Sequence, residues 1–305
     1  MVDEPSREGK GHITLTRHAD TQVLSTLSFQ YPLKLLSPRG VGQPCTSVFM
    51  MSYGGGLIGG DQISLSVHIE KECKLALLTQ GSTKIFKQRK NDAGVSVTTG
   101  QKLNVRIEEG GLLVLLPDPI QPFADSAYSQ EQVFEMLPES NLMLLDWLNS
   151  GRPARGENWT LSSFRSRNDV YEVHSLTSTA PSRRLVLRDT LILNSECAKT
   201  MYPHECFATL IIRGPLFKKF SEDLVEKFKS EEKVRRPMGM MRRDNTENKK
   251  KKERATWTAG IVRDGVCVVK VAGEKSEIVK NLLNELLVVE EIEKIVGREA
   301  LRSLL

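Results

Sequence analysis

The chain has 305 residues, of which 39% are apolar and 27% charged, so it can form one large domain or two ordinary ones. This composition is typical of globular proteins and excludes the collagen-like and low-complexity classes. Its longest apolar runs, 112–116 and 286–289, are far shorter than the roughly 18 residues of a membrane-spanning helix. Residues 1–10 are polar and lack the apolar core of a secretory signal, so we expect a cytoplasmic protein without membrane association.

The positive charge of the chain is concentrated in one segment. The formal net charge is +5, whereas the segment 235–254 alone carries nine basic and three acidic residues. The rest of the chain is therefore close to neutral. Because this segment has dense like charge and few core residues, we predict a solvated, disordered insertion. Nuclear import or nucleic-acid binding is the alternative role, but only 6% of all residues are aromatic, which makes nucleic acid an unfavoured partner.

Most of the sequence shows the pattern of β-strands. In 63–69, apolar residues alternate with polar ones, as in a strand with one buried face. Similar runs recur about every ten residues, at 13–16, 47–51, 73–78, 95–99, 103–107, 112–116, 142–145, 185–193, 208–212 and 266–271. Turns are expected between them at Gly40, Gly81, Gly94, Gly110-Gly111, Pro117, Pro138 and Asn168-Asp169. Strands this numerous, without interleaved helices, predict a β-dominated domain.

Helical periodicity appears only in the last third of the chain. Apolar residues in 216–228 lie three or four positions apart, as on an amphipathic helix. A second helix is predicted over 276–287, with Ser276 as its N-cap, and a short helical piece over 291–296. The expected fold class is therefore mainly β (α+β), with two or three helices in the C-terminal third.

The five cysteines are Cys45, Cys73, Cys197, Cys206 and Cys267, and no two of them form a C-x-x-C pair. An odd, scattered set predicts neither a disulfide framework nor a zinc ribbon, so reduced thiols are expected. The five histidines show no H-x-H or H-x-x-x-H spacing. His204 and Cys206 are the one close pair that could share a face of a strand, and two ordinary strand residues are the alternative.

A cluster of five glycines stands out in YGGGLIGGD, residues 53–61. Gly54, Gly56 and Gly59 match G-x-G-x-x-G, but that dinucleotide fingerprint requires a following helix, and here a strand is predicted. A phosphate loop would need a lysine where Asp61 stands. The glycines are instead explained by positive φ angles and close backbone approach. Asp61 could cap the turn or hold a cation.

Four motifs occur in a family-specific order: YGGGLIGGD (53–61), LLTQGSTKIF (77–86), LPDPIQPFADSAYSQ (116–130) and DWLNSGRPARGENW (146–159). With looser likeness at 204–215 and 271–277, the chain resembles UreD, also called UreH, a family of urease accessory proteins. The likeness covers about 29–288. It does not extend to 235–254, which looks like an insertion of eukaryotic relatives, and residues after 288 match poorly.

The resemblance implies a non-catalytic scaffold with two stacked, β-helix-like layers. Such proteins join UreF and the GTPase UreG on apo-urease and support nickel insertion, and a dimer of the accessory complex is compatible with this. Nickel(II) would be bound only transiently, with no stable cofactor. The expected organisation is a polar segment and first strand (1–28), one UreD-like domain (29–296) containing the insertion, and a tail (297–305).

A carrier that releases Ni²⁺ should offer sparse oxygen ligands, because several imidazoles or thiolates would hold the ion tightly. We therefore expect Asp61, Asp146 and Glu157 to contribute to a water-lined path through the β body. Structural ion pairs with Arg152, Arg155 or Lys84 are the rival interpretation. The remaining motif residues would line the path or stabilise turns: Gly54, Gly55, Gly56, Gly59, Gly60, Thr79, Gln80, Thr83, Lys84, Gly151, Arg152 and Trp159.

Enzymatic functions have little support in the sequence. It contains neither a G-x-S-x-G elbow nor an H-E-x-x-H helix. A carbohydrate-active enzyme with a β-helix-like fold is the alternative from another class, although paired carboxylates cannot be recognised by spacing alone.

Overall fold

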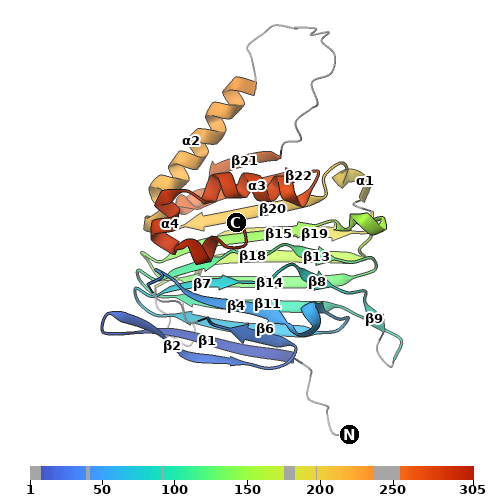
Figure 1. The fold of residues 1–305 in the computed structure, drawn as a ribbon, viewed down its shortest axis with the longest axis horizontal. Helices are drawn as coiled ribbons and strands as arrows, with labels where there is room; N and C mark the ends of the chain where they lie inside the picture. Colours follow the sequence, from blue (N-terminus) through green and yellow to red (C-terminus); the bar gives the residue numbers. More distant parts are fainter. Residues whose placement is uncertain (1–7, 39–41, 91–92, 175–182, 197, 236–254) are drawn as a thin grey trace.

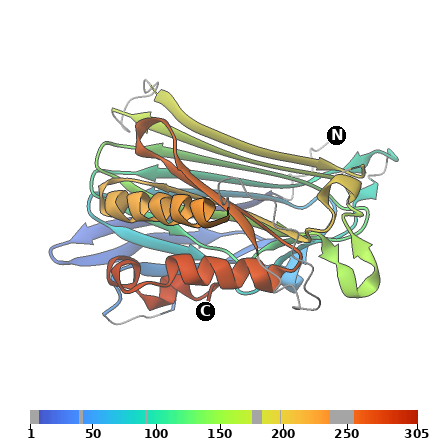
Figure 2. The same ribbon diagram turned by 90° about the horizontal axis from the view of Figure 1, so that it is seen from above.

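The computed structural model describes residues 8–38, 42–90, 93–174, 183–196, 198–235 and 255–305. Two β-sheets, sheet A and sheet B, are stacked, and most of the helical residues lie on the far side of sheet B (Figures 1 and 2). The basic segment predicted over 235–254 lies outside the described residues except for Arg235, and so does the turn expected at Gly40.

Sheet A has seven strands in the order β19-β18-β14-β11-β6-β1-β2. Their bounds are β1 (Glu8–His18), β2 (Thr21–Phe29), β6 (Gln62–Ile69), β11 (Thr99–Ile107), β14 (Ala127–Met136), β18 (Ser163–Val173) and β19 (Arg183–Asn194). The inner strands pair in parallel, while the two edge strands, β2 and β19, pair antiparallel to their neighbours.

Sheet B has eleven strands, with the main order β21-β22-β20-β15-β12-β7-β4-β3. Their bounds are β3 (Leu33–Leu36), β4 (Thr46–Ser52), β5 (Gly56–Leu57), β7 (Lys74–Leu78), β8 (Thr83–Ile85), β12 (Leu112–Leu115), β13 (Ile120–Pro122), β15 (Asn141–Asn149), β20 (Cys206–Arg213), β21 (Thr256–Ile261) and β22 (Cys267–Gly273). Two short hairpins lie outside the sheets: β9 (Arg89–Lys90) with β10 (Ser96–Val97), and β16 (Gly151–Arg152) with β17 (Glu157–Asn158).

The chain winds alternately through the two sheets. After β6 in sheet A it passes to β7 in sheet B, then to β11, β12, β14, β15 and β18, returning to the other sheet each time. Each new strand pairs in parallel with the strand one turn earlier in its own sheet. This winding gives the two-layered, β-helix-like body that the resemblance implied, and the mainly β fold class is confirmed.

Apolar side chains fill two separate layers. The first lies between the sheets and includes Leu65, Leu77, Val105 and Phe134, all at most 1% exposed. The second lies between sheet B and the helices. The helices are α1 (Ala198–Met201), α2 (Lys218–Arg235), α3 (Ser276–Leu287) and α4 (Glu290–Val296), and the short 3-10 turns are η1 (Tyr53–Gly55), η2 (Pro153–Arg155), η3 (Pro215–Phe217), η4 (Arg263–Gly265) and η5 (Arg298–Leu301). Alternating burial in the strands therefore produces one apolar layer on each side of sheet B.

The predicted late helices are confirmed as α2, α3 and α4, with small differences at their ends. Ser276 is the first residue of α3, and Lys275 occupies the N-cap position. The turn predicted at Asn168-Asp169 is wrong, because both residues lie inside β18. Asn168 donates a hydrogen bond to Asp146 across the two sheets, and Asp169 accepts hydrogen bonds from Arg188. Both polar side chains therefore have partners on other strands.

Candidate functional site

A small polar cavity of about 30 Å³ lies between the two sheets. Sheet A contributes polar side chains from β11 and β14, and sheet B contributes a carboxylate from β15. The polar lining residues are Thr79, Thr83, Gln101, Asp118, Tyr128, Gln130, Gln132 and Asp146. A space of this size holds about one water molecule, since a water needs on the order of 10–15 Å³ by the same measure.

Asp146 is the centre of the polar network beside this cavity. Its Oδ2 accepts hydrogen bonds from Ser166 Oγ at 2.5 Å and from Asn168 Nδ2 at 2.8 Å. Gln130 Nε2 approaches Asp146 Oδ1 at 3.4 Å and donates to Ser166 Oγ at 3.0 Å. Tyr128 completes the network by donating its hydroxyl hydrogen to Gln130 Oε1 at 3.2 Å. One carboxylate of sheet B is thus held by side chains of sheet A.

Burial raises the pKa of Asp146 above its ordinary value. Hydrogen bonds from Ser166 and Asn168 act against this rise, while the nearby charge of Asp189 adds to it. The carboxylate has no cationic partner among the interactions described, so its charge is compensated only by neutral donors. Asn168 Oδ1 is also buried and has no hydrogen-bond partner in the part of the chain that the structure describes. The site therefore offers spare oxygen acceptors, which suits a cation or a water molecule.

A row of polar residues leads from Asp146 towards the edge of the molecule. In sheet B, Asp146 lies beside Thr209 of β20, and Thr209 lies beside Lys270 of β22. Lys270 Nζ donates to Thr209 Oγ1 at 3.5 Å and forms an ion pair of 2.6 Å with Asp189 of β19. The Lys270 side chain is 53% exposed. The row thus ends at solvent in an ion pair that joins the two sheets.

The motif TQGSTK divides between cavity lining and turn stabilisation. Thr79 and Thr83 line the cavity, whereas Gln80 and Lys84 are exposed. Thr79 Oγ1 donates to Asp118 Oδ2 at 3.1 Å and accepts from the Asp118 backbone N–H at 2.7 Å. Thr79 therefore holds the segment at Asp118 in place and also forms part of the cavity wall.

Asp61 does not line the cavity, and its known contacts close the glycine turn. Its Oδ2 accepts a hydrogen bond of 3.0 Å from the Ile58 backbone N–H. A Cβ at Gly56 would lie 2.6 Å from the Lys84 carbonyl oxygen, and one at Gly59 would lie 2.5 Å from the Arg89 backbone nitrogen. These two glycines allow the turn to pack closely against β8 and β9. Gly54, Gly55 and Gly60 have positive φ angles, and β6 follows the turn, as the sequence predicted.

Glu157 likewise lies away from the cavity lining and pairs with Arg152. Arg152 donates Nε–H to Glu157 Oε2 at 2.7 Å and a second hydrogen bond to Oε1, and the Ala124 backbone N–H also approaches Oε2. The hydrogen bonds from Arg152 lower the pKa of Glu157 below its ordinary value. Gly151 has φ +133 beside this hairpin, and Trp159 is buried and donates Nε1–H to the His204 carbonyl oxygen.

His204 and Cys206 lie in different environments. Cys206 is fully buried in the apolar layer under the helices, and burial raises the pKa of its thiol to about 12. The His204 ring packs edge-on against Phe207, which contacts the layer between the sheets. Among the residues that the structure describes, no three His, Cys, Asp or Glu side chains are grouped to hold a metal ion.

The sequence predicted Asp146 but not the residues that contact it: Gln130 of β14 and Ser166 and Asn168 of β18. Their strands were missed because polar residues occupy inward positions, so AYSQEQVFEM shows no full apolar alternation. The available signal was an alternation in which every second residue from Tyr128 to Phe134 faces inward, although two of these inward residues are glutamines.

The comparisons with known proteins identify the family of this chain. Residues 7–304 match the family described as UreD urease accessory protein. The chain is 30% identical to urease accessory protein D of Arabidopsis thaliana, covering 94% of this chain and 98% of the plant protein. It is 32% identical to urease accessory protein UreD of Sorangium cellulosum, covering 91% and 78% of the two chains. A urease accessory protein ureD-like of Schizosaccharomyces pombe is 33% identical over 84% of this chain and 86% of its own length.

These similarities define the class as accessory proteins of urease. The chain belongs to the UreD family. The family match extends beyond both ends of the region 29–288 in which the motifs were recognised. Within the described residues, no helix combines the length and apolar character needed to cross a membrane.

Proposed function

We propose that this chain is a non-catalytic scaffold that assembles with UreF and UreG on apo-urease in the cytoplasm and supports delivery of Ni²⁺. Membership of the UreD family supports the urease connection. It favours this role over a carbohydrate-active enzyme and over a nucleic-acid binder. Nickel is cargo in this proposal, bound transiently and passed on.

The Asp146 network is the single observation that carries the metal part of the proposal. It provides one carboxylate without a cationic partner, two hydroxyl or amide donors that can reorient, and an unpaired amide oxygen on Asn168. Oxygen ligands of this kind bind Ni²⁺ more weakly than imidazole or thiolate sets, which favours release. The cavity holds about one water, so an ion passing here must exchange most of its hydration for protein oxygens.

Asp61 and Glu157 remain proposed contributors with weaker support than Asp146. Asp61 caps a turn and Glu157 is paired with Arg152, so each carboxylate already has partners. At Glu157 the positive charge of Arg152 would repel a second cation. We therefore assign the central role in the path to Asp146.

The test compares Asp146→Asn with a matched control, Asp125→Asn, whose carboxylate is 67% exposed. Each variant is co-expressed with UreF, UreG and apo-urease, and both copurification of the complex and urease activity are measured. We expect the Asp146 variant to assemble normally but to activate urease about tenfold less, as when support of a metal ligand is lost. Normal activation by a folded Asp146 variant would refute the path, and loss of assembly would assign Asp146 a structural role.

A further inference from the structure

The outer face of sheet A carries mostly polar side chains, with exposed Ile192 and Leu185 on its edge strand, and no helix of the described residues covers it. The described helices pack against sheet B, and Figure 2 shows α3 and α4 on the opposite side of the molecule from β19. Parallel sheets usually have both faces covered, whereas the inner strands of sheet A pair in parallel and leave one face bare. This departure from the usual arrangement indicates a face that a partner covers.

The charges on this face are unbalanced. Within the described strand residues, its outward side chains include seven cations and three carboxylates. The cations are Lys10, Lys102, Arg106, Arg165, Arg167, Arg183 and Arg188, and the carboxylates are Glu131, Glu135 and Asp169. The chain outside the basic segment is close to neutral, so this excess is a local property of the face.

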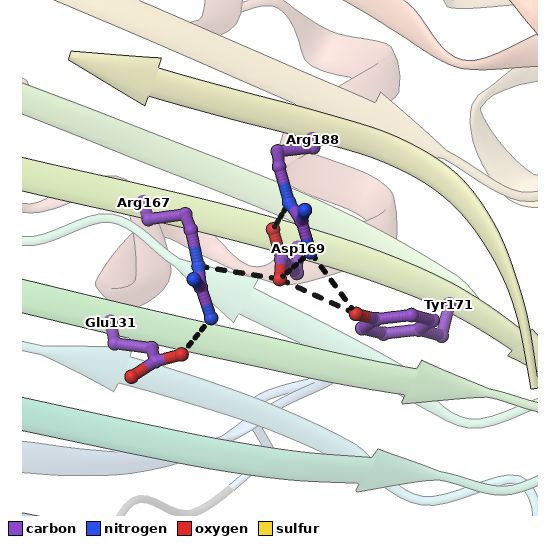
Figure 3. Close-up of polar contacts among 5 residues, drawn as sticks. All are labelled: Glu131, Arg167, Asp169, Tyr171 and Arg188. Carbon is purple, nitrogen blue, oxygen red and sulfur yellow. Dashed lines mark hydrogen bonds and ion pairs between the residues drawn. The ribbon is translucent and has the colours of Figure 1, made fainter.

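The Asp169 carboxylate lies beneath an arginine. Asp169 is 1% exposed and accepts two hydrogen bonds of 2.8 Å from Arg188, whose side chain is 47% exposed. Arg167 lies between Asp169 and Glu131, and the Tyr171 hydroxyl approaches the Asp169 carboxylate (Figure 3). Solvent therefore meets the Arg188 guanidinium above Asp169, whereas at the Arg167 pair Glu131 is the more exposed side chain, 36% against 24%.

A second carboxylate that pairs with two arginines borders a shallow groove. Glu135, 14% exposed, bridges Arg106 at 3.1 Å and Arg183 at 3.6 Å, and both arginines are at least half exposed. The groove has a volume of about 510 Å³ and crosses β1, β6, β11 and β14 over small polar residues such as Ser66 and Asn104. Arginines fixed in this way lose little conformational entropy when they bind carboxylates.

The size of the face also suits a protein partner. Seven strands about 4.8 Å apart and about ten residues long give a footprint of roughly 950 Å², enough for the roughly 800 Å² that each partner contributes to a standard interface. Among the described residues, the outward strand positions offer Tyr171 as their one aromatic side chain, which is little for base stacking. A protein surface with discrete acidic side chains fits these features better.

We propose that the outer face of sheet A is a docking surface for an acidic protein surface, whose carboxylates bind the exposed lysines and arginines of this face. This docking is independent of any metal passage through the interior. Lys102 and Arg165 are the best positions to test, because both are exposed and neither forms an ion pair with a described residue.

The test measures affinity for a short poly-L-glutamate peptide at low salt. All proteins carry Lys249→Gln, Lys250→Gln, Lys251→Gln and Lys252→Gln, so that the basic segment does not dominate. The face variant is Lys102→Glu with Arg165→Glu, and the control is Lys219→Glu with Lys229→Glu on exposed positions of α2. Lys102→Gln with Arg165→Gln serves as the milder face variant if the reversal unfolds the protein.

We expect the charge reversal on the face to weaken peptide binding about tenfold, and the control to leave it within about twofold. Equal effects of both variants, or none, would overturn the proposal. Duplex DNA and phosphatidylserine vesicles are measured at the same ionic strength. Tighter binding of either through this face than of the peptide would overturn the assignment to a protein partner.

Discussion

Asn168 of β18 donates a hydrogen bond of 2.8 Å to Asp146 of β15, and this contact joins the two sheets through their interior. It connects a carboxylate without a cationic partner to a fully buried amide. The interior is thus held together at this point by polar contacts rather than by apolar packing. The thermodynamic consequences of this contact are measurable in the isolated protein.

Asp146→Asn should stabilise the protein at neutral pH. Burial raises the folded-state pKa of Asp146, so its contribution is most favourable below the unfolded value and is lost as pH rises through the folded value. Removing the charge should therefore raise Tm at neutral and higher pH, by about 2 °C for each 1 kcal/mol gained. Thermal unfolding of both proteins across this range provides the measurement. A Tm difference that shrinks with rising pH would contradict the assignment.

Asp169→Asn should show the opposite behaviour. Burial opposes ionisation of Asp169, but Arg188 and Arg167 outweigh it and lower its pKa. Its stabilisation is present above the unfolded pKa and is lost as pH falls through the folded one. We expect a loss of about 3 kcal/mol at neutral pH, because the substitution breaks a buried ionic contact. Urea unfolding at neutral and acidic pH should show this loss fading with acid, and an equal loss at both would argue against it.

Glu157 and Arg152 should be coupled energetically. Their side chains are 18% and 29% exposed, and two hydrogen bonds join them. A double-mutant cycle with Glu157→Gln and Arg152→Met should give a coupling free energy of about 1 kcal/mol. Arg152 also stacks on Phe123 at 3.9 Å, so Arg152→Met alone should cost more than Glu157→Gln. If the effects of the two single substitutions on the free energy of unfolding are additive, the two side chains do not stabilise each other.

Gly56 and Gly54 provide a matched pair in the glycine turn. A Cβ at Gly56 would collide with the backbone of Lys84, whereas a Cβ at Gly54 would meet open space. Gly56→Ala should therefore cost about 3 kcal/mol, and Gly54→Ala about 1 kcal/mol from its positive φ alone. Chemical denaturation measures both. A larger effect at Gly54 would mean that φ, not close packing, determines the glycine requirement.

Whether a strand could be predicted from the sequence depended on whether its inward side chains are apolar or polar. Strands with apolar inward residues, such as Ile63–Ile69, were predicted from their alternation. β14 and β18 were missed because Gln130, Ser166 and Asn168 face inward. The same polar positions form the candidate site, so the pattern was weakest where the chemistry is concentrated.

The candidate site was predicted only in part for a related reason. Asp146 lay in a recognisable motif, but its partners come from β14 and β18, which pair in parallel in sheet A and are brought close to Asp146 by the stacking of the two sheets. Asp61, Asp146 and Glu157 look equivalent as isolated carboxylates. Only the structure shows that Ile58 and Arg152 satisfy two of them.

The most direct test of the proposed role is complementation in cells that have lost their own UreD. The full chain is expressed there with its native UreF, UreG and urease, and urease activity and nickel content per urease are measured. The account predicts that both return in cells expressing the chain and stay absent with an empty vector. Urease that remains inactive and nickel-free despite soluble chain and intact partners would contradict it.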